Sequence, residues 1–185
     1  YTQLKNIATS SDNKLESMRG LLRCQYKLQQ WSAALPNAQD LLQQKGIADD
    51  DQQIANLIIA KNLQTQGNND DAITTYKKVF AIGKSEYAAE ARYHVAEILY
   101  NQAQYKDAEK AAFEVINKAG SYDYWITSSY ILLGEIYFKE NDLFNAEATL
   151  KSVVENASDA DLKQQAQQKL AEVQQAKKQN SKLSN

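Results

Sequence analysis

The feature that most constrains this chain is an alanine that recurs at nearly constant spacing. Ala34, Ala72, Ala108 and Ala146 are separated by steps of 38, 36 and 38 residues. Each follows a short polar stretch and stands within an apolar pattern of helical period. Self-similarity with a period of about 20 to 50 residues is typical of proteins that stack one small unit many times. The chain is therefore predicted to be a repeat array.

The segment 86–118 shows what the unit is. In its first half, Ala91 and Val95 begin one stripe of a helix with 3.6 residues per turn. Its second half shows the same spacing from Ala108 onward. The joint at 101–104 is too short for anything but an antiparallel return. The unit is predicted to be a hairpin of two amphipathic helices.

The last full unit resembles the tetratricopeptide repeat (TPR). It carries Leu-Gly, a Tyr three residues later and then the periodic Ala, at the family's spacing: Tyr130, Leu133, Gly134, Tyr137, Ala146, Leu150 and Val153. The other units have Leu22, Ala60 and Ala96 in place of the glycine, and Ser158 stands near the place of the family's closing proline. The period also exceeds the family's usual length, which predicts longer loops or helices. The resemblance covers about 15–160 and implies an all-α, right-handed superhelical solenoid of antiparallel helix pairs.

The period divides the chain into four repeats with a partial element at each end. Residues 1–9 show the stripe of a second helix with no first helix before it, so we expect a fragment of a larger protein. The predicted ranges are 1–10 for that truncated repeat, 15–48, 50–84, 86–121 and 123–157 for repeats 1 to 4, 160–176 for a C-terminal capping helix, and 177–185 for a frayed tail.

Local signals mark several helix ends. Gly67 is predicted to take a left-handed conformation in its turn. Three acids, 49–51, favour a helix start because they complement the macrodipole. Pro36 lies early in a second helix and predicts either a local kink or a later start of that helix. The aromatic connection 120–125 is predicted to be a packed loop between repeats.

Composition and motifs argue against catalysis. One His and one Cys, His94 and Cys24, fall in different repeats, and a nucleophile needs a base within hydrogen-bond reach. No phosphate loop, CxxC, HExxH or GxSxG motif occurs. Cys24 is predicted to pack inward and His94 to serve a surface or inter-repeat role. We expect no enzyme, no metal, no cofactor and no small-molecule substrate.

The concave groove of a solenoid is the expected binding surface, since stacking sets equivalent residues of the first helices side by side. Three rows are expected: Arg23, Lys61, Glu97 and Glu135; Arg19, Leu57, Tyr93 and Ile131; Tyr26, Gln64, Tyr100 and Phe138. Arg and aromatic residues commonly anchor interfaces. The ten candidate groove residues are Arg19, Arg23, Tyr26, Lys27, Lys61, Tyr93, Glu97, Tyr100, Glu135 and Phe138.

The charges of these rows suggest where a partner's charges would lie. Acidic groups of a partner are expected near Arg19, Arg23 and Lys27. Basic groups are expected near Glu97 and Glu135. The alternative is that Lys61 and Glu97 pair with each other, or that the row is simply solvated, because exposed pairs contribute about 0–1 kcal/mol. Some TPR proteins grip a C-terminal carboxylate with Lys, Asn and Arg. The matching places here hold a different set, without Asn: Arg19, Arg23, Ile58, Glu90 and His94.

The sequence thus predicts a non-catalytic scaffold that binds a partner protein or peptide segment in its groove. The alternative is a structural spacer or self-association module in a bacterial envelope complex, with homodimers formed through exposed end repeats. Nucleic acid is not expected as a partner, because 21 Lys+Arg against 23 Asp+Glu leave a net charge of −2. The repeats also resemble those of bacterial envelope TPR proteins, which implies a periplasmic or outer-membrane-associated location.

Overall fold

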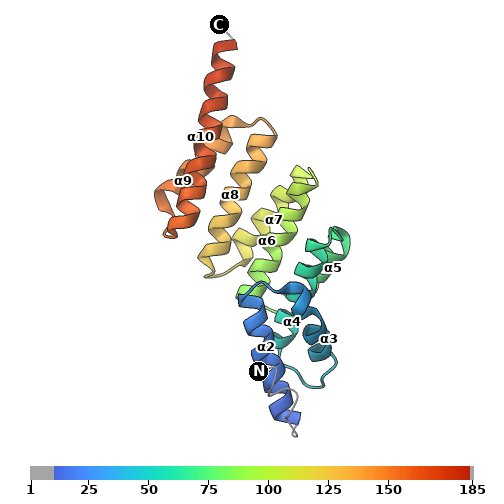
Figure 1. The fold of residues 1–185 in the computed structure, drawn as a ribbon. Coiled ribbons are helices and arrows are strands. Elements are labelled where there is room, and N and C mark those ends of the chain that lie inside the picture. Colours follow the sequence, from blue (N-terminus) through green and yellow to red (C-terminus); the bar gives the residue numbers. More distant parts are fainter. Residues whose placement is uncertain (1–10, 184–185) are drawn as a thin grey trace. The chain divides into compact units, whose positions relative to one another are not determined.

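The computed structural model describes residues 11–183 and shows only helices within them (Figure 1). The all-α prediction is confirmed for this part of the chain. The predictions for residues 1–10 and for the last two residues of the tail lie outside it. The helices are α2 Ser11–Lys27, α3 Trp31–Leu42, α4 Asp49–Thr65, α5 Asn69–Ile82, α6 Glu86–Asn101, α7 Tyr105–Lys118, α8 Asp123–Lys139, α9 Leu143–Asn156 and α10 Ala160–Leu183.

The chain forms two compact units, Tyr1–Ala91 and Arg92–Asn185, whose boundary falls inside α6. In the first unit, α3 packs against both α2 and α4, and α4 packs against α5. Apolar stripes of these helices meet in one core, in which the buried side chains are Met18, Leu22, Ala34, Ala38, Leu41, Ile54, Ala55 and Ile58. This unit is thus built of helix pairs that share one continuous core.

The second unit has two linked clusters. One joins the later turns of α6 to α7 and α8 through Ala96, Ala112 and Leu133, among others. The other joins α8 and α9 to α10 through residues such as Leu150 and Ala166. The helix α10 packs on α9 and also on α8, so it covers the apolar face that the last hairpin would otherwise show to water.

The closing helix is longer than the sequence predicted. It continues past residue 176 to Leu183, through most of the segment that we expected to be a frayed tail. In Figure 1 its final turns run beyond the α8–α9 hairpin. Two features explain the added length. Lys177 on α10 pairs with Glu147 on α9, which fixes this part of the helix to its neighbour, and the segment contains lysine, glutamine and leucine, which favour helix.

The turn inside each hairpin has the same geometry. Gln29, Gly67, Ala103 and Asn141 all have positive φ, between 54° and 78°, and are separated by the steps of the alanines. The backbone N–H of the residue after each of these donates to the carbonyl five residues before it. In the third hairpin, for example, Gln104 donates to the Leu99 carbonyl at 2.9 Å. This pattern ends a helix with a left-handed residue, which Gly adopts at least cost. The left-handed conformation predicted for Gly67 is confirmed.

The four periodic alanines occupy one equivalent position. Each is fully buried, and its N–H donates at 2.9–3.0 Å to the carbonyl of the residue that precedes the second helix. A methyl group is the largest side chain that lets two helices approach closely at such a joint. The alanines Ala34, Ala72, Ala108 and Ala146 therefore mark the same joint in successive hairpins.

Two local predictions need correction. The helix α3 begins at Trp31, in register with the other second helices, so the later start suggested by Pro36 does not occur. Instead the helix is short, with 12 residues where α5, α7 and α9 have 14. The end of the segment 120–125 is not loop, because α8 already begins at Asp123. The helix start predicted at 49–51 is confirmed, since α4 begins at Asp49.

None of the helices between residues 11 and 183 combines the length and apolar character needed to cross a bilayer.

Candidate functional site

In the first unit, several of the ten groove residues are held in contacts between helices. Glu90 is only 3% exposed, yet its carboxylate contacts two of them. The Lys61 ammonium lies 2.6 Å from one of its oxygens, and the Tyr26 hydroxyl donates to the other. Lys61 also lies 4.9 Å from the centroid of the Trp31 ring. These groups stabilise the stacking of α2, α4 and the start of α6.

Tyr26 is the centre of this network. Its ring meets Trp31 edge-on at 5.9 Å between centroids and Tyr87 at 5.6 Å. Burial, and then the negative charge of Glu90, raise the pKa of Tyr26, so its hydroxyl stays protonated and available as a donor. Tyr26 therefore stabilises the packing of these helices, in addition to being a candidate contact for a partner.

The remaining basic groove residues differ in exposure. Arg19 donates from Nε to the buried carboxylate of Asp51 at 2.7 Å, which ties α2 to α4. Arg23 and Lys27 are exposed on α2. Of the predicted basic cluster on α2, these two residues are exposed, whereas Arg19 is only partly so. Two of the places compared with the carboxylate clamp, Arg19 and Glu90, are therefore used within the protein.

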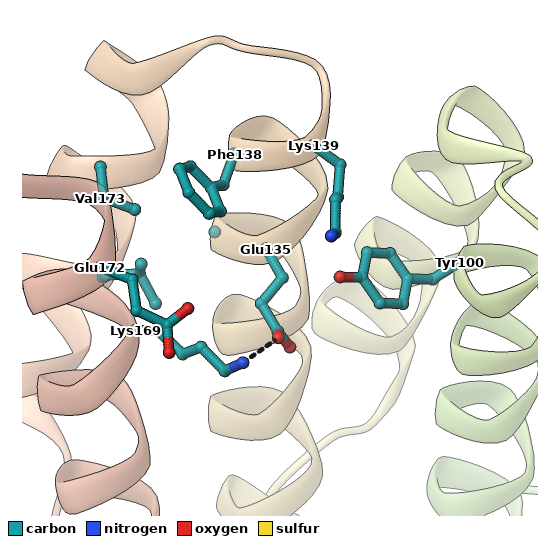
Figure 2. Close-up of a pocket in the computed structure, with 9 residues that line it drawn as sticks. Tyr100, Glu135, Phe138, Lys139, Lys169, Glu172 and Val173 are labelled. Carbon is teal, nitrogen blue, oxygen red and sulfur yellow. Dashed lines mark ion pairs between the residues drawn. The ribbon is translucent and has the colours of Figure 1, made fainter. Parts of the chain in front are cut away.

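In the second unit, three groove residues line one cavity of about 80 Å³ (Figure 2). Tyr100 comes from α6, and Glu135 and Phe138 come from α8. Phe138, Leu150 and Val173 give the cavity an apolar floor. The polar groups at its rim include Lys139, Lys169 and Glu172. An apolar floor with a polar rim is the usual anatomy of a contact site for a partner's side chain.

Electrostatics within this cavity are set by one ion pair. The Lys169 ammonium on α10 lies 2.8 Å from a carboxylate oxygen of Glu135, as drawn in Figure 2. The hydrogen bond to Glu135 raises the pKa of Lys169. Burial, and then the Glu135 charge, raise the pKa of Tyr100. Both groups therefore keep their protons at neutral pH and act as donors.

The other two groove residues belong to an aromatic cluster. Tyr93 contacts Trp125 at 5.5 Å between centroids, and His94 contacts the same indole at 5.9 Å. Tyr124 meets it edge-on at 5.0 Å. His94 places Nδ1 2.8 Å from a carboxylate oxygen of Glu97. The cluster thus joins α6 to the first turn of α8.

Sequence reasoning missed Tyr124, Trp125 and Lys169. The first two stand in a segment that the sequence predicts to be a loop. In the structure Tyr124 continues a stripe of α8 at helical steps, through Ser128, Ile131 and Glu135 to Phe138, and Trp125 follows it in the same first turn. That spacing was visible and could have been extended backward. Lys169 gave no such signal, because it comes from a helix outside the repeats.

No group of three His, Cys, Asp or Glu side chains within the described residues could hold a metal ion. The prediction that Cys24 packs inward is wrong, because this thiol is exposed on α2. It stands two residues after the buried Leu22, which puts it on the opposite side of the helix. His94 lies on α6 with its side chain 14% exposed, and it packs against Trp125 of α8, consistent with the inter-repeat role expected for it.

Comparison with known families shows that residues 127–159 match the tetratricopeptide repeat. This range covers most of α8 and all of α9. The curated proteins give no match.

Solved structures show the same fold over nearly the whole chain. BtubC (BKLC) from P. vanneervenii matches with a TM-score of 0.73 at 16% identity, covering 95% of this chain and 79% of that one. The TPR-like repeats of a kinesin light chain from Podosopora anserina give 0.63 at 19% identity, with 91% and 89% covered. MamA from Desulfovibrio magneticus RS-1 gives 0.58 at 16% identity, with 93% and 98% covered. The chain therefore has a TPR-like helical-repeat fold, and its residues 127–159 match the tetratricopeptide repeat.

Proposed function

We propose that this protein is a non-catalytic scaffold that holds a segment of a partner protein against the first helices of its hairpins. The observation that carries the proposal is the cavity in the second unit. Three residues chosen from sequence as groove contacts, Tyr100, Glu135 and Phe138, line that one hollow from two different helices.

The size of the cavity favours a side chain over a whole small molecule. Sites for drug-sized ligands usually enclose about 300–1,000 Å³, whereas this one has about 80 Å³. Its floor of Phe138, Leu150 and Val173 would desolvate an apolar group of the partner. Tyr100 at its edge supplies a large contact area with few rotatable bonds.

The first unit contributes charge at its surface. Arg23 and Lys27 are exposed on one helix and would attract an acidic part of the partner. Lys61, in contrast, lies against buried Glu90, so reversing its charge would disturb the fold as well as any contact. A charge-reversal test of partner binding is therefore best made at Arg23 and Lys27.

Site-specific cross-linking tests the proposal. The photoreactive residue benzoylphenylalanine replaces Tyr100, or Phe138, in the full chain. The matched control carries it at Lys151, an exposed position on the second helix α9. After illumination in an extract of the source organism, we expect one partner polypeptide to be captured from Tyr100 and Phe138 and not from Lys151. R23E/K27E should reduce that capture while leaving the circular dichroism spectrum unchanged.

Two results would overturn the proposal. Equal capture from Lys151 would show that the first helices are not a specific surface. Cross-links formed only between copies of this chain would instead support the structural alternative, in which the repeats self-associate. Light scattering over a range of protein concentrations would then report the dimer directly.

A further inference from the structure

A half-exposed tyrosine stands at the surface of the aromatic cluster in the second unit. Tyr124 is 49% exposed, although its ring packs edge-on against Trp125. Behind it, Tyr93 and His94 contact the same indole, so the exposed ring is held in place from one side. A fixed aromatic ring with one open side offers its π-face to a ligand without a large ordering cost.

The groups around this ring are acidic. The Glu97 carboxylate lies within the cluster, 2.8 Å from Nδ1 of His94. Burial first, and then the charges of Glu97 and Glu135, raise the pKa of Tyr93. On another side, Tyr124 lines a hollow of about 310 Å³ together with two more carboxylates, Asp123 and Asp159.

The remaining groups of the hollow accept hydrogen bonds as well. They are the hydroxyl groups of Thr127 and Ser158, and no cationic side chain of the described residues lines it. Lys169, the cation bound to Glu135, lies on the other cavity and offsets one of the four negative charges. The surface around Tyr124 therefore combines an open ring with an excess of negative charge.

We infer that an arginine side chain of the partner segment docks here, with its guanidinium against Tyr124 and its charge balanced by the neighbouring carboxylates. We call the surface formed by Tyr93, His94, Glu97, Asp123, Tyr124, Trp125 and Asp159 the aromatic–acidic patch. The inference rests on the proposed function, because it names the chemistry of the partner at the same first helices.

Arginine fits the patch better than other side chains. Its planar guanidinium stacks on aromatic faces and presents several donors in one plane, which matches a ring flanked by carboxylates. An acidic segment would meet like charges from Glu97, Asp123 and Asp159.

Nuclear magnetic resonance on the ¹⁵N-labelled chain tests the inference. The probe is the peptide acetyl-Gly-Arg-Gly-amide, and its matched control has citrulline, an uncharged isostere, in place of arginine. The reporter is the indole N–H signal of Trp125, assigned with the variant W31F because the chain has two tryptophans. We expect a saturable shift of that signal with the arginine peptide, weakened by added salt, and none with the citrulline peptide.

Variants locate the contact. Y124L should weaken binding of the arginine peptide by about threefold or more, the effect expected when a cation loses an aromatic face. The matched control is Y130L, since Tyr130 is also exposed on α8, at 38%, but lies on a different hollow. E97Q/D123N should weaken binding as well. Equal shifts with both peptides, or equal effects of Y124L and Y130L, would overturn the inference.

The two proposals fail separately. If a partner is captured from Tyr100 while the Trp125 signal does not shift with the arginine peptide, the inference about the aromatic–acidic patch is overturned and the scaffold function stands. If the arginine peptide binds at Tyr124 but no partner is captured from Tyr100 or Phe138, the patch stands and the scaffold function is overturned.

Discussion

Lys61 and Glu90 form a nearly buried ion pair, with 2.6 Å between the ammonium nitrogen and the carboxylate oxygen. Their side chains are 13% and 4% exposed, respectively. Lys61 was predicted to contact a partner, yet it lies within the stack of the first unit. A residue on a groove-forming helix can therefore stabilise the array itself. A mutation at such a residue changes the stability of the fold as well as any binding of a partner.

Removing one member of this pair should destabilise the first unit strongly. Lys61→Met leaves the Glu90 carboxylate buried without this cation, and such a change typically costs about 3 kcal/mol or more. The double variant K61M/E90Q removes both charges, keeps an acceptor for the Tyr26 hydroxyl, and should recover much of that loss. Urea unfolding followed by circular dichroism measures both. A K61M variant as stable as the parent protein would contradict the predicted role of the pair.

The hairpin turns predict a stabilising substitution. Ala103 has φ of 59°, a conformation that costs an L-residue with a Cβ about 1–2 kcal/mol. Ala103→Gly should therefore raise the free energy of unfolding by several tenths to about 1 kcal/mol, after the added freedom of the unfolded chain is subtracted. Gly67→Ala, at the equivalent turn, is the matched control and should lower stability. If both substitutions destabilise, the shared turn geometry is wrong.

The crossing of α8 and α9 depends on a glycine. A Cβ added to Gly134 would lie 2.5 Å from Cγ of Leu150, so Gly134→Ala should overpack the joint and cost about 1–3 kcal/mol. The equivalent pair one repeat earlier is Ala96 with Ala112, both fully buried. Converting repeat 4 to that pair, as G134A/L150A, should cost less than the sum of the two single changes. Thermal unfolding of the three variants measures the coupling, and strict additivity would argue against the contact.

The start of α9 should show a specific pH dependence. The Asp142 carboxylate accepts the backbone N–H of Asn145 at 3.1 Å, and this bond lowers the pKa of Asp142 below its ordinary value of 3.8. A lowered pKa contributes stability above the ordinary value, and that contribution is lost as the pH falls through the folded pKa.

The comparison that isolates this effect uses two variants. D142A should be less stable than the parent protein at pH 7, and the two should converge in strong acid. D142N keeps a capping acceptor and should lie between them at pH 7. A constant difference between D142A and the parent across the pH range would contradict the assignment.

The extended end of α10 can be tested through Glu147. Its carboxylate accepts hydrogen bonds from Lys177 and from Gln174, which lower its pKa below 4.5. In the variant K177Q we expect the pKa of Glu147 to rise toward the ordinary value. Carbon-detected nuclear magnetic resonance during an acid titration measures it. An unchanged pKa would mean that the helix does not hold Lys177 at this position in solution.

The sequence was sufficient for the architecture because the relevant signals are local and repeated. A buried alanine every 36 to 38 residues is needed wherever two helices cross closely, and a short joint of fixed length permits one turn geometry. The same reasoning located Gly67 in a left-handed turn and Asp49 at a helix start. These are properties of a few neighbouring residues, so a pattern in the chain determines them.

Only the tertiary structure decided which groove residues are available to a partner. The rows identify residues on equivalent faces, but a long charged side chain on such a face can reach several partners from other helices. Lys61 forms an ion pair with Glu90. Glu135 forms one with Lys169 of α10, a helix that belongs to no full repeat. Such pairings depend on the packing of distant segments and on side-chain conformation, which the period does not encode. The array was therefore determined by the sequence pattern, and the accessible chemistry of its surface by the folded contacts.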